Sequence, residues 1–245
     1  MASETATAEL DLVKEDFSTG EELPTDEKPK EYVLSKTLRS LLNLLTHVLM
    51  IITVFICLVF ACKSHIGIYE LHIISGVIGY QFFMCQGILV LAKYNAWSIY
   101  LRRLHRIHIH WVLELVAVAL VTAGGVFFIL ELPAHFTTLH GSFGLVALGA
   151  TLLSTFLGIV AGISYMAKAC APARRWFKYI HHAISVIALL LASVSLCLAY
   201  DNPTFKIWTS RWFENDEFPV PIIMLITLLF TCLVAFEFVI ALIWV

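Results

Sequence analysis

From about residue 40 onward, the chain consists of long apolar runs separated by short polar intervals. Each run has roughly 20 residues, which is the length an α-helix needs to cross the hydrocarbon core of a bilayer. The runs are continuous rather than alternating, so they predict helices and not the strands of a membrane barrel. We therefore predict six transmembrane helices, at residues 40–62, 70–92, 109–131, 139–165, 179–200 and 220–244.

Residues 1–35 differ from the rest of the chain. They contain ten Asp and Glu and almost no apolar periodicity, which predicts a disordered acidic tail. The start MASETATAEL has neither the apolar core of a signal peptide nor the second-position Gly of a myristoylation site. The predicted organisation is a cytoplasmic tail at 1–35 and a six-helix transmembrane domain at 36–245.

Composition supports an integral membrane protein. Hydrophobic residues make up 60 % of the chain, charged residues 14 %, and the mean hydropathy is +0.85. Soluble domains have about 45–50 % apolar and about 25 % charged residues. The net charge of −2 and the lack of a basic patch with interleaved aromatics exclude nucleic acid as a partner. The six cysteines form no CxxC pair and have no regular spacing, so they predict neither a disulfide framework nor a zinc site.

The basic residues predict the orientation in the membrane. Twelve Lys and Arg lie in residues 28–39, just before the first predicted helix, or in the second-to-third and fourth-to-fifth loops, whereas only Lys63, Lys206 and Arg211 lie on the opposite side. Cytoplasmic loops carry the excess of positive charge in membrane proteins. Both termini are therefore predicted to be cytoplasmic.

Four of the ten histidines lie near the starts of four successive predicted helices: His72, His110, His140, and His181 or His182. Because neighbouring helices run in opposite directions, His72 and His140 share the non-cytoplasmic level. His110 and the histidine at 181 or 182 share the cytoplasmic level. Two such pairs are the arrangement that two bis-imidazole haems require.

Helical periodicity leaves two ligand positions open. His181 lies on a face with the small residues Ser185, Ala188 and Ala192, whereas His182 lies over larger ones. Likewise, His108 and His110 point to different sides of one helix. The pattern alone does not choose between the members of either pair.

The chain resembles the cytochrome b561 family of transmembrane electron carriers over residues 40–245. The resemblance rests on the six predicted helices, the four histidines and three strings: HWVLE from His110, HFTTLHGSFGL from His135 and HHAIS from His181. These strings most closely resemble one branch of the family, that of cytochrome b561 domain-containing protein 2. The members of this branch are ascorbate-dependent ferric reductases. In that branch the ligand precedes Trp in one helix and Ala-x-Ser in another, which indicates His110 and His182.

The resemblance implies two haems b per chain in a bundle of helices two to five, flanked by the first and last helices. His72 and His140 are then the iron ligands of the non-cytoplasmic haem, and His110 and His182 those of the cytoplasmic haem. In the implied mechanism, cytosolic ascorbate gives electrons to the cytoplasmic haem. The electrons pass to the non-cytoplasmic haem and leave to a ferric chelate or to monodehydroascorbate. The implied activity is that of a transmembrane ferrireductase.

Candidate substrate residues follow from charge. Ascorbate is an anion, and the predicted cytoplasmic loops offer Arg102, Arg103, Arg106, Arg175 and Lys178 to attract it. After the second helix, the family's classical branch has an Arg-bearing motif, but this chain has GILVLAKYN with Lys93 as the only cation. On the far side, His65, Glu70 and His135 are candidates for contact with a ferric ligand.

The branch implies an endoplasmic reticulum or cytoplasmic vesicle membrane, with the plasma membrane as an alternative, and family members form homodimers. Three other functions compete with this interpretation. A di-haem cytochrome subunit could exchange electrons with quinone, a transporter could use the histidines for a metal ion or protons, and a tetraspan-like protein could be structural. The absence of a GxGxxG motif argues against a self-contained flavin-linked reductase.

Overall fold

The computed structural model describes residues 29–63, 65–92, 94–133, 137–167, 170–211 and 219–243. Within these ranges it contains helices and turns but no strand, and six helices are long and apolar enough to cross a membrane. This confirms the predicted all-α fold. The helices are α2 (Pro29–Ala61), α3 (Ile68–Gly76), the π-helix η1 (Val77–Met84), α4 (Cys85–Leu89), α5 (Arg103–Glu131), α6 (Leu139–Met166), α7 (Ala171–Tyr200), α8 (Pro203–Ser210) and α9 (Pro219–Ile243).

Several helices begin earlier than the apolar runs predict. α2 begins at Pro29, inside the segment 1–35 predicted as a tail, and residues 1–28 lie outside the described part of the chain. α5 begins at Arg103 and α7 at Ala171, well before residues 109 and 179. Basic side chains continue a helix beyond the apolar span because their long apolar stems pack while their charges reach water. Proline in the first turn of α2 and α7 suits a helix start.

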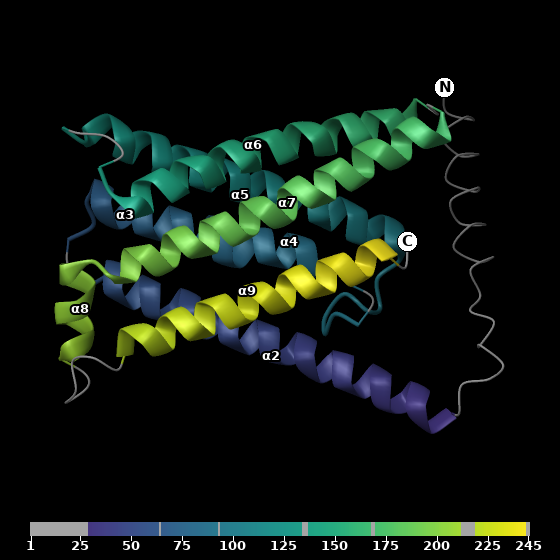
Figure 1. The fold of residues 1–245 in the computed structure, drawn as a ribbon, viewed down its shortest axis with the longest axis horizontal. Coiled ribbons are helices and arrows are strands. Elements are labelled where there is room, and N and C mark those ends of the chain that lie inside the picture. Colours follow the sequence, from purple (N-terminus) through teal and green to yellow (C-terminus); the bar gives the residue numbers. More distant parts are fainter. Residues whose placement is uncertain are drawn as a thin grey trace.

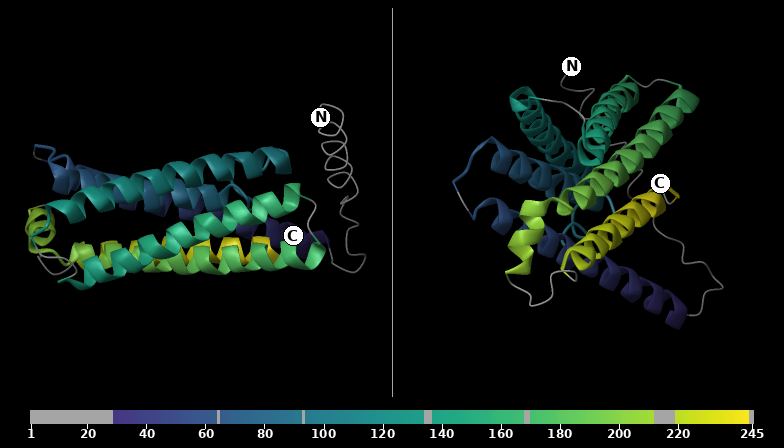
Figure 2. Two further views of the ribbon diagram at one scale, coloured as in Figure 1. Left: turned by 90° about the horizontal axis from the view of Figure 1, so that it is seen from above. Right: turned by 60° about the vertical axis from the view of Figure 1, so that its left-hand side comes forward.

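The long helices run roughly along one axis (Figures 1 and 2), in three neighbouring groups. α6 packs along α7, α5 packs along the continuous unit α3–η1–α4, and α2 packs with α9. α8 lies at one end of the molecule, and the α6–α7 connection lies at the other. We call the latter the basic end, because the first turns of α5 and α7 place Arg103, Arg106, Arg174 and Arg175 there.

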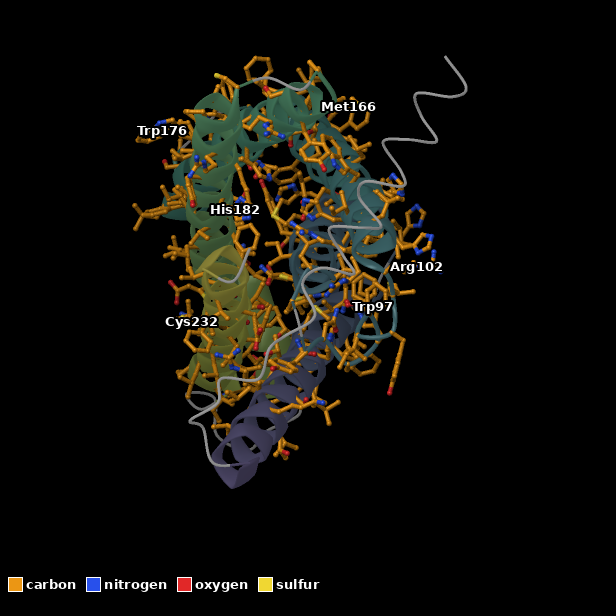
Figure 3. The ribbon with its side chains drawn as sticks, turned by 90° about the vertical axis from the view of Figure 1, so that its right-hand side faces the viewer. Trp97, Arg102, Met166, Trp176, His182 and Cys232 are labelled. Carbon is orange, nitrogen blue, oxygen red and sulfur yellow. The ribbon has the colours of Figure 1, made fainter. Side chains whose placement is uncertain are left out.

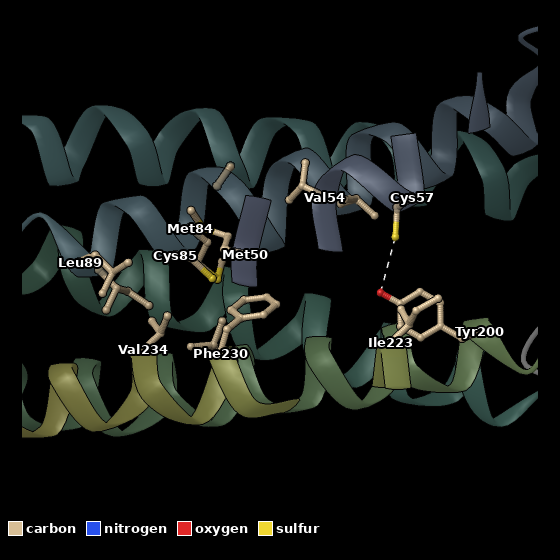
Figure 4. Packing of buried hydrophobic residues seen from close by; sticks show 14 of the residues in the cluster. Met50, Val54, Cys57, Met84, Cys85, Leu89, Tyr200, Ile223, Phe230 and Val234 are labelled. Carbon is tan, nitrogen blue, oxygen red and sulfur yellow. Dashed lines mark hydrogen bonds between the residues drawn. The ribbon is translucent and has the colours of Figure 1, made fainter. Parts of the chain in front are cut away.

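The apolar core lies among α2, η1, α4, α7 and α9 (Figure 4). Met50, Leu89 and Phe230 are fully buried in it. The Tyr200 hydroxyl lies 3.5 Å from the Cys57 sulfur, which links α7 to α2. By contrast, Phe127 and Leu130 on α5 are 63 % and 73 % exposed, as expected of side chains that face lipid.

The second membrane-spanning helix changes to a π-helix at Val77–Met84. A π-helical segment is rare and often occurs at functional sites. Here it packs directly on α5. A Cβ at Gly79 would lie 3.1 Å from the Ala117 carbonyl oxygen and would collide with Val121, so the close approach requires glycine. The contact fixes α3 and α4, on either side of η1, against α5.

Candidate metal centres

Towards the end opposite the basic end, His72 of α3 and His140 of α6 face each other. Their ring centroids lie 6.1 Å apart, with the ring planes at 78°. His72 Nδ1 lies 3.2 Å from the Gly124 carbonyl oxygen on α5. His140 Nδ1 lies 2.8 Å from the Ser195 carbonyl oxygen on α7. The structure therefore brings together the two histidines that the sequence assigned to one level.

Towards the basic end, His110 of α5 faces His181 of α7. Their centroids lie 6.5 Å apart, with the planes at 74°. His110 Nδ1 lies 2.7 Å from the Gly87 carbonyl oxygen on α4, and His181 Nδ1 lies 2.9 Å from the Ser154 carbonyl oxygen on α6. This second pair repeats the geometry of the first.

The bonds at Nδ1 determine what each ring can do. A carbonyl oxygen only accepts hydrogen bonds, so Nδ1 of each of these four histidines must carry the proton and donate. In a neutral imidazole this leaves the lone pair on Nε2. A bond from the other ring nitrogen to a carbonyl is the usual way in which proteins fix the orientation of a metal-ligating histidine. All four rings are therefore prepared to ligate through Nε2.

The four bonds also follow a reciprocal pattern. His72 of α3 donates to α5, and His110 of α5 donates back to α4 of the same continuous unit. His140 of α6 donates to α7, and His181 of α7 donates back to α6. Each facing pair then takes one histidine from each of these two helix groups. A group held between the facing rings would join the two groups, which make few direct contacts with each other.

The geometry fits a metal held in a macrocycle. An imidazole nitrogen bonds a metal at about 2.0–2.1 Å and lies about 1.1 Å from its ring centre, so one metal between two imidazoles sets the ring centres roughly 6 Å apart. The observed values of 6.1 and 6.5 Å agree with this spacing. A Cβ at Gly76, one turn after His72, would meet no atom within 4 Å, so there is open space on the helix one turn after this histidine.

Each pair supplies only two nitrogens. Within the described ranges, no three His, Cys, Asp or Glu side chains gather as a metal site. A porphyrin supplies four nitrogens in a plane, so iron in haem b needs only the two axial ligands that such a pair offers. The residues present therefore fit haem b at both positions.

His182, the ligand indicated by the resemblance, has different surroundings. Its ring stacks on Phe238 of α9, with centroids 4.6 Å apart and planes at 4°. Its Nδ1 lies 2.8 Å from the Lys178 carbonyl oxygen, one turn back on its own helix. Figure 3, viewed from the basic end, shows His182 on α7 beside α9. Adjacent residues on an α-helix point about 100° apart, so His181 and His182 cannot face the same partner, and the geometry pairs His181 with His110.

The predicted substrate cations lie at the basic end. Arg102 is the N-cap residue of α5, and both Arg102 and Arg103 are exposed. Arg106 donates to the Ala92 carbonyl oxygen at 3.5 Å, so it also holds the α4–α5 loop. Lys178 is half-buried and lies close enough to Arg103 for repulsion.

Arg175 is exposed on the first turns of α7. On the opposite side, His65 is exposed, and Glu70 Oε2 accepts a hydrogen bond from the Gly67 amide at 2.9 Å. His135 and Lys93 lie outside the described residues.

Sequence reasoning missed the serines beside two of the histidines. Ser195 Oγ lies 3.0 Å from His140 Nδ1 and donates to the His140 carbonyl oxygen. Ser154 Oγ lies 3.3 Å from His181 Nδ1 and 2.6 Å from Ser185 Oγ. The only available signal was the spacing of small residues along α6 and α7, and that pattern also serves ordinary helix packing in membranes.

A polar network holds the loop between α4 and α5. Trp97 donates its indole N–H to the Gln86 side-chain oxygen at 3.0 Å, and the Gln86 amide nitrogen lies 3.0 Å from His47 Nδ1. His47 Nε2 donates in turn to Asn95 Oδ1 at 3.0 Å. Both ring nitrogens of His47 are therefore in use, which makes it a structural residue and not a metal ligand.

The six membrane-length helices and the facing histidine pairs are features of a multi-pass helical haem protein. Residues 71–206 match the family model of eukaryotic cytochrome b561, which covers more than half of the chain and all four of these histidines. The chain belongs to the eukaryotic cytochrome b561 family. Membership makes it a haem b protein of transmembrane electron transfer and an oxidoreductase. No curated protein matches the sequence.

Proposed function

We propose that the chain binds two haems b, one between His72 and His140 and one between His110 and His181, and that it transfers electrons from ascorbate to an acceptor across the membrane. The observation that carries this proposal is that the four imidazole rings make the same kind of hydrogen bond. Each donates Nδ1–H to a carbonyl on a neighbouring helix and keeps Nε2 for a metal. In this assignment His181 replaces His182.

When bound, each haem supplies an iron that changes between ferric and ferrous by one electron. The protein's task is to hold the two centres in line across the bilayer. His140 and Ser154, which contact different centres, lie fourteen residues apart on α6, which is about 21 Å of helix. The carbonyl bonds keep the imidazoles basic and oriented, which sets the potential of each centre together with burial.

Ascorbate binds, in this proposal, at the basic end. There Arg102, Arg103 and Arg175 are exposed, and they raise the local concentration of an anion. The positive-inside rule assigns this end to the cytoplasm. Ascorbate loses one electron and one proton and becomes monodehydroascorbate. No carboxylate chain is needed across the membrane because only the electron crosses.

The acceptor at the opposite end is a ferric chelate or monodehydroascorbate, and with the former the protein is a ferrireductase. The HWVLE and HFTTLHGSFGL strings support the branch of ascorbate-dependent ferric reductases. The same branch supports an endoplasmic reticulum or vesicle membrane as the location. The family also supports a homodimer as the assembly.

Reconstitution tests the proposal. Purified protein is inserted into liposomes, with ascorbate on one side and ferric citrate plus a ferrous chromophore on the other. The proposal predicts bleaching of the oxidised haem spectrum by ascorbate and formation of ferrous iron in the other compartment. A protein without haem would contradict it, and so would haem that ascorbate does not reduce. Protein-free liposomes with the same contents are the control.

A further inference from the structure

A pocket of about 280 Å³ opens at the end opposite the basic end. Its lining comes from the end of α2, the start of α3 and the start of α8, and includes Phe60, Lys63, Tyr69, Glu70, Ile73 and Thr204. Ligand pockets typically measure about 300–1,000 Å³, so this one suits a small molecule and not a redox protein.

The charges at the pocket favour an anion. The Lys63 ammonium lies over the Phe60 ring, 3.6 Å from its centroid, and Arg211 lies near enough to repel it. Among the described residues that line the pocket, Glu70 is the only carboxylate, and it already accepts a hydrogen bond from the Gly67 amide at the start of α3. Among the side chains that the structure describes here, Lys63 and its neighbour Arg211 offer two positive charges against one engaged carboxylate.

The pocket wall connects to a metal centre through aromatic rings. Tyr69 lines the pocket, and its ring centroid lies 6.1 Å from that of Phe128 on α5. Phe128 stacks on the His72 imidazole, with centroids 4.4 Å apart and planes at 18°. Ile73, the residue after His72, also lines the pocket. Electron tunnelling falls off steeply with distance, so a packed chain of rings is a favourable route between the centre and the pocket.

From these observations we propose that the pocket binds a small anionic one-electron acceptor, and that Phe128 and Tyr69 provide the packed route from the His72 centre. The inference rests on the proposed function, because it places the acceptor of that reaction. A ferric carboxylate chelate and monodehydroascorbate share the required chemistry. In the first case ferric iron gains one electron and becomes ferrous, and in the second the radical gains one electron and a proton. Ascorbate supplies the electron in both.

Binding tests the charge argument without turnover. Gallium citrate is a redox-inert analogue of ferric citrate, and its affinity for the purified holoprotein is measured by calorimetry. We expect Lys63→Gln to weaken binding by roughly fivefold, because it removes a cation at the pocket. Lys206→Gln is the matched control. Lys206 lies at the same end but is paired with Asp201 at 2.5 Å and does not line the pocket. Equal affinity of both variants for gallium citrate would overturn the proposal.

Kinetics distinguish the two acceptors. Oxidation of ascorbate-reduced protein is followed with ferric citrate and, separately, with enzymatically generated monodehydroascorbate. A higher KM for either acceptor in Lys63→Gln supports the pocket and identifies its ligand. An unchanged KM for both would contradict it. If ascorbate does not reduce the haem, the proposed function fails, but the calorimetric result still decides the anion site.

The aromatic route has its own test. Phe128→Leu removes the ring and should slow oxidation at saturating acceptor by about tenfold while KM stays unchanged. Phe128→Tyr keeps a ring of the same shape and should restore the rate. The reduced-minus-oxidised spectrum reports whether the His72 centre is intact in both variants. Equal rates in Phe128→Leu and the wild type, with intact spectra, would overturn this part of the proposal.

Discussion

The imidazoles of His110 and His181 lie with their centroids 6.5 Å apart, and each donates Nδ1–H to a carbonyl on a neighbouring helix. His182, one residue further along α7, stacks on Phe238 instead. This relationship assigns the second histidine pair and leads to a direct mutational test.

His181→Ala should remove the haem of the basic end, because an iron that needs two axial nitrogens loses one of them. His182→Ala should retain both haems and lose only the packing against Phe238. Pyridine haemochromogen assays give the haem content of each purified variant. If His182→Ala halves the haem content and His181→Ala does not, the assignment is reversed.

Gly158 provides a test that leaves every ligand in place. A Cβ at this position would lie 3.0 Å from His181 Cε1 and 3.2 Å from its Nδ1. Gly158→Ala should therefore shift the His181 ring and broaden or reduce the signal of one low-spin haem. Gly149 lies on the same helix, and a Cβ there would meet nothing within 4 Å. Gly149→Ala should keep both haem signals and stabilise α6 by about 0.5–1 kcal/mol, and an identical loss in both variants would refute the steric explanation.

The two serines should tune the two centres separately. Ser195 Oγ lies 3.0 Å from His140 Nδ1, so it helps to keep that imidazole basic. Ser195→Ala leaves the hydrogen bond from His140 Nδ1 to the backbone carbonyl of residue 195 but removes the hydroxyl acceptor. The reduction potential of the haem held by His140 should then rise by on the order of tens of millivolts. Ser154→Ala should shift the other haem in the same direction. Spectroelectrochemical titration resolves the two midpoints, and a shift of the same midpoint by both variants would count against two distinct centres.

His47 should matter for stability and not for haem content. His47→Leu leaves the half-buried Gln86 amide and the buried Asn95 amide without their shared partner, and an unsatisfied buried polar group costs about 1–3 kcal/mol. The thermal midpoint in detergent should fall by several degrees while the purified fraction keeps two haems. His108 is exposed on α5, so His108→Leu is the control and should leave the midpoint nearly unchanged.

The acceptor pocket predicts a pH dependence. Burial, and then the Arg211 guanidinium, lower the pKa of Lys63 below the ordinary value of 10.5, and Glu70 opposes this. The charged form attracts an anion, so the attraction is present below the lowered pKa and is lost as pH rises through it. The KM for ferricyanide should therefore begin to rise at a pH below 10.5. Lys63→Arg, whose side chain stays charged, should abolish that rise. A rise that persists in Lys63→Arg would assign it to another group.

The sequence predicted the helices well because their signal is local. Apolar runs of membrane length located all six spans, and the positions of His72, His110 and His140 follow from where those runs begin. The choice between His181 and His182 depended on a contact across the bundle. The Ala-x-Ser string after His182 indicated His182 as the ligand. The small residues that share a face with His181 instead favour His181, which is the histidine that faces His110 in the structure.

Other features have no local signal at all. The π-helix at Val77–Met84 depends on how closely α5 approaches Gly79, and nothing in VIGYQFFM specifies that contact. α7 ends at Tyr200, and α8 begins three residues later. Asn202 caps the start of α8, because its side-chain oxygen accepts a hydrogen bond from the Thr204 amide at 2.9 Å. The partners of the histidine Nδ1 atoms are backbone carbonyls, which every residue has, so only the fold could identify them.

The central claim is that two histidine pairs hold two haems b in one chain. The most direct measurement is a reduced-minus-oxidised absorption spectrum of the purified wild-type protein, combined with the molar ratio of haem to protein. The account predicts b-type spectra, two haems per chain and reduction by ascorbate. One haem per chain, or none after expression with ample haem supply, would contradict it.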